Sequence, residues 1–379
     1  MNSFFALLKN IFFILVTPVA WMLRKKAGVP RHILVVQGSK LGDMVCTTPL
    51  FRAVKERYPH SHLTVMGNAV NKELLAGHPR IDMYRIRPPG FFALLKFLRE
   101  EKFDFVCMTS PDPEMLTAFL CARIPLVAVP YITNGWSSYN TRVYRILSRF
   151  ATVVPHRMGS YAPREYLRLL EPLGIMSEDT RKELAVAPET VERIRRMLIE
   201  RGCDFKKDFL VGIAPSAGSK IKVWGAEHFA YLADVLTRKH AATIVLVGSP
   251  GDKEEVDAMK RALPPRMRLV DTAGKLSIEE LKALVGQLRL FISSDTGPIY
   301  IAEAFGIPTV DIIGPMDENE QPPRGPKHRV VVPPGRKVPA LHIMNAAMID
   351  RVEARRQAQS TTRESVVREI EDLLQHLGR

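Results

Sequence analysis

A loop of the form Gly38-Ser-Lys-Leu-Gly42-Asp43 follows the apolar run 32–37 and carries the first side chain able to do chemistry. Its glycines let a backbone pass close to a ligand. Asp43 stands where a carboxylate either caps the next helix or acts as a general base. The spacing matches neither the GxGxxG dinucleotide fingerprint nor a Walker loop. Both interpretations of Asp43 are therefore open.

A second loop, residues 212–224, places Lys220 and Lys222 among glycine and serine. It is a near miss to a P-loop, because five residues rather than four separate its two glycines and Ser precedes Lys. A pair of lysines still holds a diphosphate as point charges. The alternative is a solvated surface loop in which Trp224 anchors the next helix by packing.

The third loop reads Ser294-Asp295-Thr296-Gly297-Pro298 and opens a helix. Free backbone N–H groups at a helix start, together with a threonine hydroxyl, form an anion site, and Pro298 suits a first-turn position. Asp295 is alternatively only a helix cap. The DTG letters also occur in aspartic proteases, but those need a second such turn and an all-β body, which this sequence lacks.

Short apolar runs alternate with helical patterns and so position these loops. Buried strands are expected over 32–37, 63–66, 103–108, 126–129, 209–213, 243–247, 268–271, 290–293 and 309–313. Helices are expected over 47–58, 72–76, 91–101, 226–240, 252–263, 278–284 and 298–305. Residues 135–205 lack strand runs and suggest peripheral helices. The pattern predicts an α/β protein with two Rossmann-like domains, whose ligands bind beyond the carboxyl ends of the strands.

Four segments follow from these patterns: an N-terminal extension over 1–30, Rossmann-like domains over 31–185 and 186–345, and closing helices over 346–379. Two helices are expected in the tail, over 345–359 and 361–377. In the second, Thr361 and Glu364 have capping-box spacing. The apolar face of that helix comprises Val366, Val367, Ile370, Leu373, Leu374 and Leu377.

The N-terminal extension is apolar over 11–23 and carries Lys9, Arg24, Lys25, Lys26 and Arg31 without an acid up to residue 31. Thr17 and Pro18 interrupt this run, and as a helix its 13 residues reach about 20 Å, against about 30 Å of hydrocarbon. The order of charges also does not fit a secretory signal. We expect a membrane-associating helix, peripheral or monotopic, with the basic cluster on anionic headgroups. The alternative is an amphipathic helix packed on the protein itself.

Composition and net charge limit the kinds of partner and bound metal that the protein is expected to have. The 379 residues carry a net charge of +14, which favours an anionic partner. No nucleic-acid motif and no basic stripe interleaved with aromatics is present, so nucleic acid is not expected. Four cysteines without a CxxC pair or a nearby His cluster encode neither zinc site nor disulfide framework, which fits a reducing cytoplasm.

Together these loops resemble glycosyltransferase family 9, the heptosyltransferases of lipopolysaccharide core assembly. The resemblance rests on segments 33–59, 214–236, 245–255, 271–285 and 291–315, in the family's order. It implies a GT-B fold, with two Rossmann-like domains facing across a cleft. It also implies inverting transfer from a nucleotide sugar without an essential metal or other cofactor.

The resemblance also implies roles for individual residues. Asp43 would be the general base, with Gly42 beside it close to the donor, and Lys222 would bind the donor phosphates. Asp295, Thr296 and Gly297 would surround the sugar and diphosphate. Two further contacts to the nucleotide, to its ribose and base, would come from Asp252 and Leu276.

The sequence departs from the family where Tyr300 replaces the histidine of GPxH and where KRWP reads Lys222-Val223-Trp224-Gly225. Tyr300 is kept as a donor contact, but both changes leave the donor sugar open, with ADP-heptose as the family expectation. The leading hypothesis is transfer of a heptose or related sugar to a lipopolysaccharide inner-core or other lipid-linked acceptor at the inner face of the cytoplasmic membrane. The candidate cations for the acceptor are Arg85, Arg87, Lys96 and Arg99. The alternative is a catalytically silent scaffold that binds sugar nucleotides or lipids.

Overall fold

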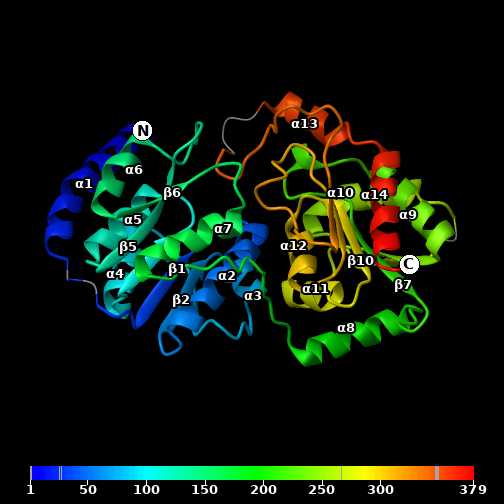
Figure 1. The fold of residues 1–379 in the computed structure, drawn as a ribbon, viewed down its shortest axis with the longest axis horizontal. Coiled ribbons are helices and arrows are strands. Elements are labelled where there is room, and N and C mark those ends of the chain that lie inside the picture. Colours follow the sequence, from blue (N-terminus) through cyan, green and yellow to red (C-terminus); the bar gives the residue numbers. More distant parts are fainter. Residues whose placement is uncertain (1, 25, 27, 266, 346–349) are drawn as a thin grey trace. The chain divides into compact units, whose positions relative to one another are not determined.

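The computed structural model describes residues 2–379 apart from 25, 27, 266 and 346–349. The chain divides into two compact units. The first is Met1–Arg181 with Ile343–Met348, and the second is Lys182–His342 with Ile349–Arg379. Each unit contains one six-stranded parallel sheet with helices on its faces (Figure 1).

The first sheet has the strand order β3-β2-β1-β4-β5-β6, and all pairs are parallel. Its central strands are nearly all buried because helices cover both faces, as the apolar runs required. The strands are β1 (His32–Val36), β2 (His62–Gly67), β3 (Met83–Ile86), β4 (Phe105–Met108), β5 (Leu126–Ile132) and β6 (Thr152–His156).

The second sheet repeats this order as β12-β11-β10-β7-β8-β9, again all parallel. Counted within each unit, both sheets run 3-2-1-4-5-6, the doubly wound Rossmann order. The strands are β7 (Phe209–Ala214), β8 (Ala242–Leu246), β9 (Leu269–Asp271), β10 (Leu290–Ser294), β11 (Thr309–Ile312) and β12 (His328–Val331).

Helices of the first unit are α1 (Asn2–Met22), α2 (Leu41–Arg57), α3 (Ala69–Leu74), α4 (Phe91–Glu101), α5 (Pro113–Cys121), α6 (Arg142–Leu147) and α7 (Ala162–Leu167), with 3₁₀ turns η1 (Ser148–Phe150) and η2 (Arg168–Leu173). In α2, Pro49 cannot donate to the carbonyl of Val45, four residues earlier. The hydroxyl of Thr48 donates to that carbonyl at 2.8 Å instead, so the carbonyl of Val45 keeps a hydrogen-bond donor within the helix that carries Asp43.

Helices of the second unit are α8 (Pro188–Glu200), α9 (Ala226–His240), α10 (Lys253–Ala262), α11 (Ile278–Val285), α12 (Gly297–Ala304), α13 (Arg351–Gln359) and α14 (Arg363–His376), with 3₁₀ turns η3 (Lys220–Lys222) and η4 (Pro250–Asp252). Trp224 is buried in this unit's core, and its indole donates to the carbonyl of Thr361 at 2.7 Å. Trp224 also packs against Phe229 of α9, which is the anchoring role given in the alternative interpretation of its loop.

The N-terminal helix α1 packs on α5 and α6 through one face, on which Phe13, Thr17 and Ala20 are buried. Its opposite face is apolar and exposed, with Leu15 at 68% and Met22 at 76% exposure. One face of α1 thus packs on the protein, as the alternative interpretation of the extension predicted, whereas the opposite face does not. Among the described residues, no helix combines the length and apolarity needed to cross a membrane. Lys25 of the expected basic cluster lies outside the described residues.

Two expectations for the elements were wrong. The strand β6 lies within 135–205, where none was expected, because Thr152, Pro155 and His156 interrupt its apolar run. Helix α14 is capped by Thr362, whose hydroxyl accepts from the N–H of Ser365 at 3.2 Å, not by a Thr361 capping box.

Candidate active site

The second sheet changes winding direction between β7 and β10, which lie side by side. Connections that leave these two strands run to opposite sides, so a crevice opens beyond their carboxyl ends. The loop after β7 carries Lys222, and the loop after β10 carries Asp295. Two loops that lie far apart in the sequence therefore meet at the position where a doubly wound sheet binds ligands.

Lys222 and Asp295 form an ion pair there, with 2.6 Å between the lysine Nζ and the carboxylate Oδ2. The side chain of Asp295 is 4% exposed and that of Lys222 is 15% exposed, so water screens the pair little. The hydroxyl of Tyr300 donates to the other carboxylate oxygen of Asp295. An ammonium group has three donor positions, so this pair leaves Lys222 able to bind further anionic oxygens.

Tyr300 is itself held by a second buried charge. The Nζ of Lys182 lies 5.8 Å from the centre of the Tyr300 ring and 2.5 Å from Oε2 of Glu303. The Lys182 side chain is completely buried. The phenol thus sits between a fixed cation and the carboxylate of Asp295, which fixes the direction of its hydroxyl.

Thr296 and Gly297 begin α12, with Thr296 in extended conformation at the N-cap. The Thr296 hydroxyl makes no capping hydrogen bond to the helix, and the first turn contains no acid. The partial positive charge of the helix start is therefore not offset by a local carboxylate in the first turn. This is the arrangement of an anion site next to the Lys222–Asp295 pair.

Asp252 follows β8 in the turn η4 and reaches back to the loop after β7. Its carboxylate accepts from the hydroxyl of Ser216 at 2.5 Å and from Ser249 N–H and Oγ at 2.7 Å each. Burial raises the pKa of Asp252, but the Ser216 and Ser249 hydrogen bonds and the charge of Lys220 outweigh it and lower the pKa below its usual value. Leu276 is half-buried, immediately before Ser277, which caps α11.

Asp311 was not expected from the sequence. It lies on β11, paired in register with Ser293 of β10, and is fully buried. Neither of its carboxylate oxygens has a hydrogen-bond partner among the described residues. Burial first, and then the charge of Asp295, raises the pKa of Asp311 well above its usual value, which favours the neutral carboxyl. In the sequence, the buried carboxyl was indicated by a single acid, Asp311, inside the apolar run 309–313.

In the first unit, Asp43 lies in the first turn of α2, and its Oδ2 accepts from the backbone N–H of Lys40 at 3.2 Å. The side chain is half-buried, and Gly42 beside it is buried. Asp43 therefore makes the helix-capping contact that was one of its two interpretations. The base role remains a proposal.

The four candidate acceptor cations are all exposed. Arg87 pairs with Asp112 at 2.9 Å, and Lys96 lies 3.9 Å from Glu100. Arg85 stacks over the ring of Phe97, and Arg99 donates to a backbone carbonyl. Each already has a partner within the first unit.

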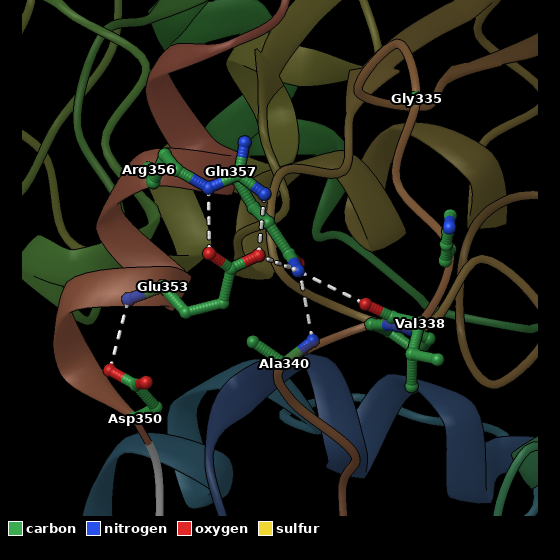
Figure 2. A pocket seen from close by; sticks show the side chains of 9 residues that line it. Gly335, Val338, Ala340, Asp350, Glu353, Arg356 and Gln357 are labelled. Atoms are coloured by element: carbon green, nitrogen blue, oxygen red, sulfur yellow. Dashed lines mark hydrogen bonds and ion pairs between the residues drawn. The ribbon is translucent and has the colours of Figure 1, made fainter.

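A shallow pocket of about 550 Å³ lies where α13 meets the segment 335–340 of the second unit. Among its lining residues, Glu353 binds Arg356, and Gln357 binds the backbone of Val338 and Ala340 (Figure 2). These contacts hold α13 on the segment and leave no convergent set of groups for a ligand. The described residues contain one group able to hold a metal ion, Asp317, Glu320 and His342.

A family model described as glycosyltransferase family 9 (heptosyltransferase) matches residues 91–347, more than half of the chain. The chain belongs to glycosyltransferase family 9. It is thus an enzyme, a glycosyltransferase. Lipopolysaccharide heptosyltransferase 3 of Escherichia coli is 27% identical over 293 residues, which cover 73% of this chain and 81% of that protein.

Solved structures agree in fold. A family 9 glycosyl transferase from Veillonella parvula has a TM-score of 0.72 at 22% identity, over 91% of this chain and 97% of its own. The E. coli ADP-heptose lps heptosyltransferase II has a TM-score of 0.70 at 20% identity, over 92% of this chain and 100% of its own. The expected GT-B fold, built from two Rossmann-like domains, is confirmed.

Proposed function

We propose that this family 9 enzyme is an inverting heptosyltransferase, which moves a heptose from ADP-heptose to an inner-core lipopolysaccharide or other lipid-linked acceptor. The observation that carries the proposal is the buried Lys222–Asp295 pair at the β7/β10 switch point, beside the start of α12. It supplies a fixed cation and a helix start for a diphosphate, the common feature of nucleotide-sugar donors.

In the proposed reaction an acceptor hydroxyl oxygen attacks the anomeric carbon from the face opposite the diphosphate. The bond from that carbon to the phosphate oxygen breaks as the new glycosidic bond forms, so a single displacement inverts the configuration. Asp43 takes the hydroxyl proton. Lys222 and the N–H groups at the start of α12 stabilise the negative charge that develops on the departing nucleoside diphosphate. None of these steps uses a metal ion.

Individual donor contacts follow from the same assignment. Thr296 and Gly297 would contact the diphosphate and sugar, with Tyr300 orienting Asp295 toward the sugar hydroxyls. Asp252, ionised and held by three hydrogen bonds, suits a ribose diol. Leu276 offers an apolar surface for the base. The E. coli enzyme of similar fold is named ADP-heptose lps heptosyltransferase II, so ADP-heptose is the first donor to test here.

The N-terminal helix supports a location on the cytoplasmic face of the membrane. An apolar helix face is normally buried against another apolar surface, here the membrane. The basic residues after the helix suit anionic headgroups. Arg85, Arg87, Lys96 and Arg99 remain candidates for the phosphates and carboxylates of the acceptor. The enzyme would then reach its lipid-linked substrate while bound to the same surface.

The test is a transfer assay with purified enzyme, ADP-heptose and a heptose-deficient lipopolysaccharide acceptor, read by mass spectrometry. We expect one added heptose, and a loss of at least about 100-fold in kcat for Asp43→Asn. Asp234→Asn, on the surface of α9, is the matched control. Near-normal turnover by Asp43→Asn would remove the base role, and donor binding without transfer or hydrolysis would support the silent scaffold.

A further inference from the structure

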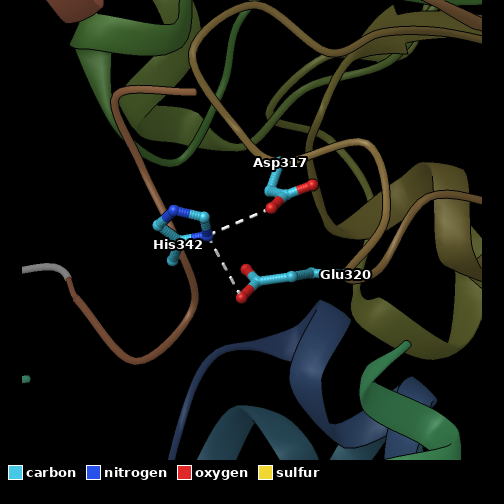
Figure 3. A group of neighbouring side chains, drawn as sticks. All are labelled: Asp317, Glu320 and His342. Atoms are coloured by element: carbon cyan, nitrogen blue, oxygen red, sulfur yellow. Dashed lines mark ion pairs between the residues drawn. The ribbon is translucent and has the colours of Figure 1, made fainter. Parts of the chain in front are cut away.

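Asp317, Glu320 and His342 converge from two segments of the second unit (Figure 3). Asp317 and Glu320 lie in the loop after β11, and His342 comes from the extended chain after residue 335. One donor atom of each side chain lies within 4.8 Å of the others. None of these residues has a role in the proposed transfer.

The backbone around the three side chains is fixed. Leu341, next to His342, donates to the carbonyl of Pro315 at 2.9 Å and accepts from the N–H of Asp317 at 3.1 Å. Arg336 donates to the carbonyls of Gly314 and Met316 at 2.7 and 2.6 Å. The two segments are thus joined on both sides of the cluster, so the three side chains are held together by more than their own attraction.

The donor atoms have the separations of a metal-ligand set. The Nδ1 of His342 is 3.2 Å from Oδ2 of Asp317 and 3.4 Å from Oε1 of Glu320. With metal–ligand bonds of about 2.1 Å, neighbouring ligands lie roughly 3.0 Å apart in octahedral and about 3.4 Å apart in tetrahedral geometry. The Nδ1 is buried and faces both carboxylate oxygens.

Asp317 is oriented by a second contact. Its other oxygen, Oδ1, accepts from the N–H of Asn319 at 2.8 Å and from the Asn319 side-chain amide at 3.0 Å. This contact turns Oδ2 toward His342. Outer contacts that orient a first ligand are typical of metal sites.

Burial and charge set the class of ion. The carboxylate side chains of Asp317 and Glu320 are 7% and 3% exposed, while the His342 side chain is 22% exposed. The two carboxylates raise the pKa of His342 to about 9, so without a metal ion the imidazolium supplies one positive charge to the pair. A divalent ion bound to the neutral imidazole would supply two. One imidazole and two carboxylates suit zinc, manganese or ferrous iron rather than calcium or a soft copper ion.

We propose that Asp317, Glu320 and His342 bind one divalent transition-metal ion, which ties the loop after β11 to the chain at His342. Three protein ligands leave one or more coordination positions open to water. The inference stands apart from the transfer reaction, because it concerns ligands that the proposed mechanism does not use.

The experiment measures metal binding directly. Full-length protein is stripped with a chelator, dialysed and titrated with Zn²⁺ and, separately, with Mn²⁺ by calorimetry, with bound metal counted by mass spectrometry. We expect one ion per chain, and a loss of at least about tenfold in affinity for each of Asp317→Asn, Glu320→Gln and His342→Asn. His240→Asn is the control, because His240 faces a single carboxylate, that of Glu371, at 3.2 Å.

X-ray absorption of the zinc-loaded wild type keeps the test decisive if a variant fails to fold. One imidazole with oxygen ligands and no sulfur is expected. Sulfur ligation would point to the free cysteines and overturn the proposal, as would unchanged affinity in all three variants or no binding at about 100 µM metal. Transfer activity is assayed in parallel, so a failure of the proposed function leaves the binding result intact.

Discussion

Asp311 is a buried carboxyl on β11, the strand next to β10, and Asp295 directly follows β10. Below pH 3.8, its ordinary pKa, folded and unfolded chains both hold the proton. Above it, the unfolded chain releases the proton while the folded chain keeps it, because the pKa is raised in the folded state. The free energy of unfolding therefore falls with rising pH by up to about 1.4 kcal/mol per pH unit from this group.

Asp311→Asn removes that ionisation at nearly constant shape. We expect the variant to gain stability relative to the wild type as pH rises from 4 to 8, measured as the difference in Tm at several pH values. Asp372→Asn, with a side chain that is 61% exposed, is the control and should show no such gain. A difference between wild type and Asp311→Asn that is constant with pH would contradict the raised pKa of Asp311.

The Lys222–Asp295 pair predicts strong coupling between its two partners. Lys222→Met leaves the buried carboxylate of Asp295 without its cation, and removing one partner of a buried pair costs about 3 kcal/mol. Lys222→Met with Asp295→Asn removes both charges and should restore most of that loss. A double-mutant cycle by urea unfolding measures the coupling. Additive effects on the free energy of unfolding would show that the two groups do not stabilise each other. Both Lys222→Met and the double variant should lose donor binding.

Part of this site was predictable from the sequence. Lys222, Asp295 and Tyr300 were singled out from loops after apolar runs or from a family motif, and the structure joins all three. Asp311, Ser216 and Lys182 were not, because their importance depends on which strands and loops are neighbours. Neither spacing nor residue type reveals that Asp311 stands beside Ser293 before the strand order is known.

At the scale of elements, the buried strands and the longer helices were the predictable part. Helices α4 and α9 have the expected bounds, and the expected apolar face of α14 packs in the core. The strands β3, β6 and β12 were missed. All three lie at or near sheet edges, are four or five residues long and contain polar residues, so neither length nor periodicity distinguishes them from loops.

Helix α1 predicts opposite effects for its two faces. Leu15→Glu with Met22→Glu changes exposed positions, so stability should hardly change, while binding to phosphatidylglycerol-containing vesicles should fall about 100-fold, since each apolar side chain contributes about 1.5 kcal/mol on burial. Phe13→Ala, on the packed face, should instead lower the free energy of unfolding by about 3 kcal/mol. Vesicle sedimentation and thermal unfolding separate the two. Undiminished vesicle binding by the Glu variant would exclude this face as the membrane contact.

At the scale of the whole molecule, each unit contains a histidine whose pKa is depressed to about 4, namely the buried His156 in the first and the half-buried His328 in the second. Burial first, and then the charge of Arg168, lowers the pKa of His156 to about 4. Burial, with Lys182 and Lys327, lowers that of His328 to about 4. The carboxylate of Glu165 lies 3.8 Å from Nδ1 of His156, beyond hydrogen-bond distance. The two units therefore share one response to acid.

Between pH 6.5 and about 4 the unfolded chain binds a proton at each histidine and the folded chain does not, so stability falls as the pH falls. A shift of that size corresponds to about 3 kcal/mol per histidine. We expect His156→Gln to flatten the pH dependence of unfolding in the first unit and His328→Gln to flatten it in the second. Proteolysis at pH 5, with cleavage sites mapped by mass spectrometry, assigns the loss to a unit. Equal protection of both units by either single variant would show that their unfolding is coupled, and no protection by either would contradict the depressed pKa of the two histidines.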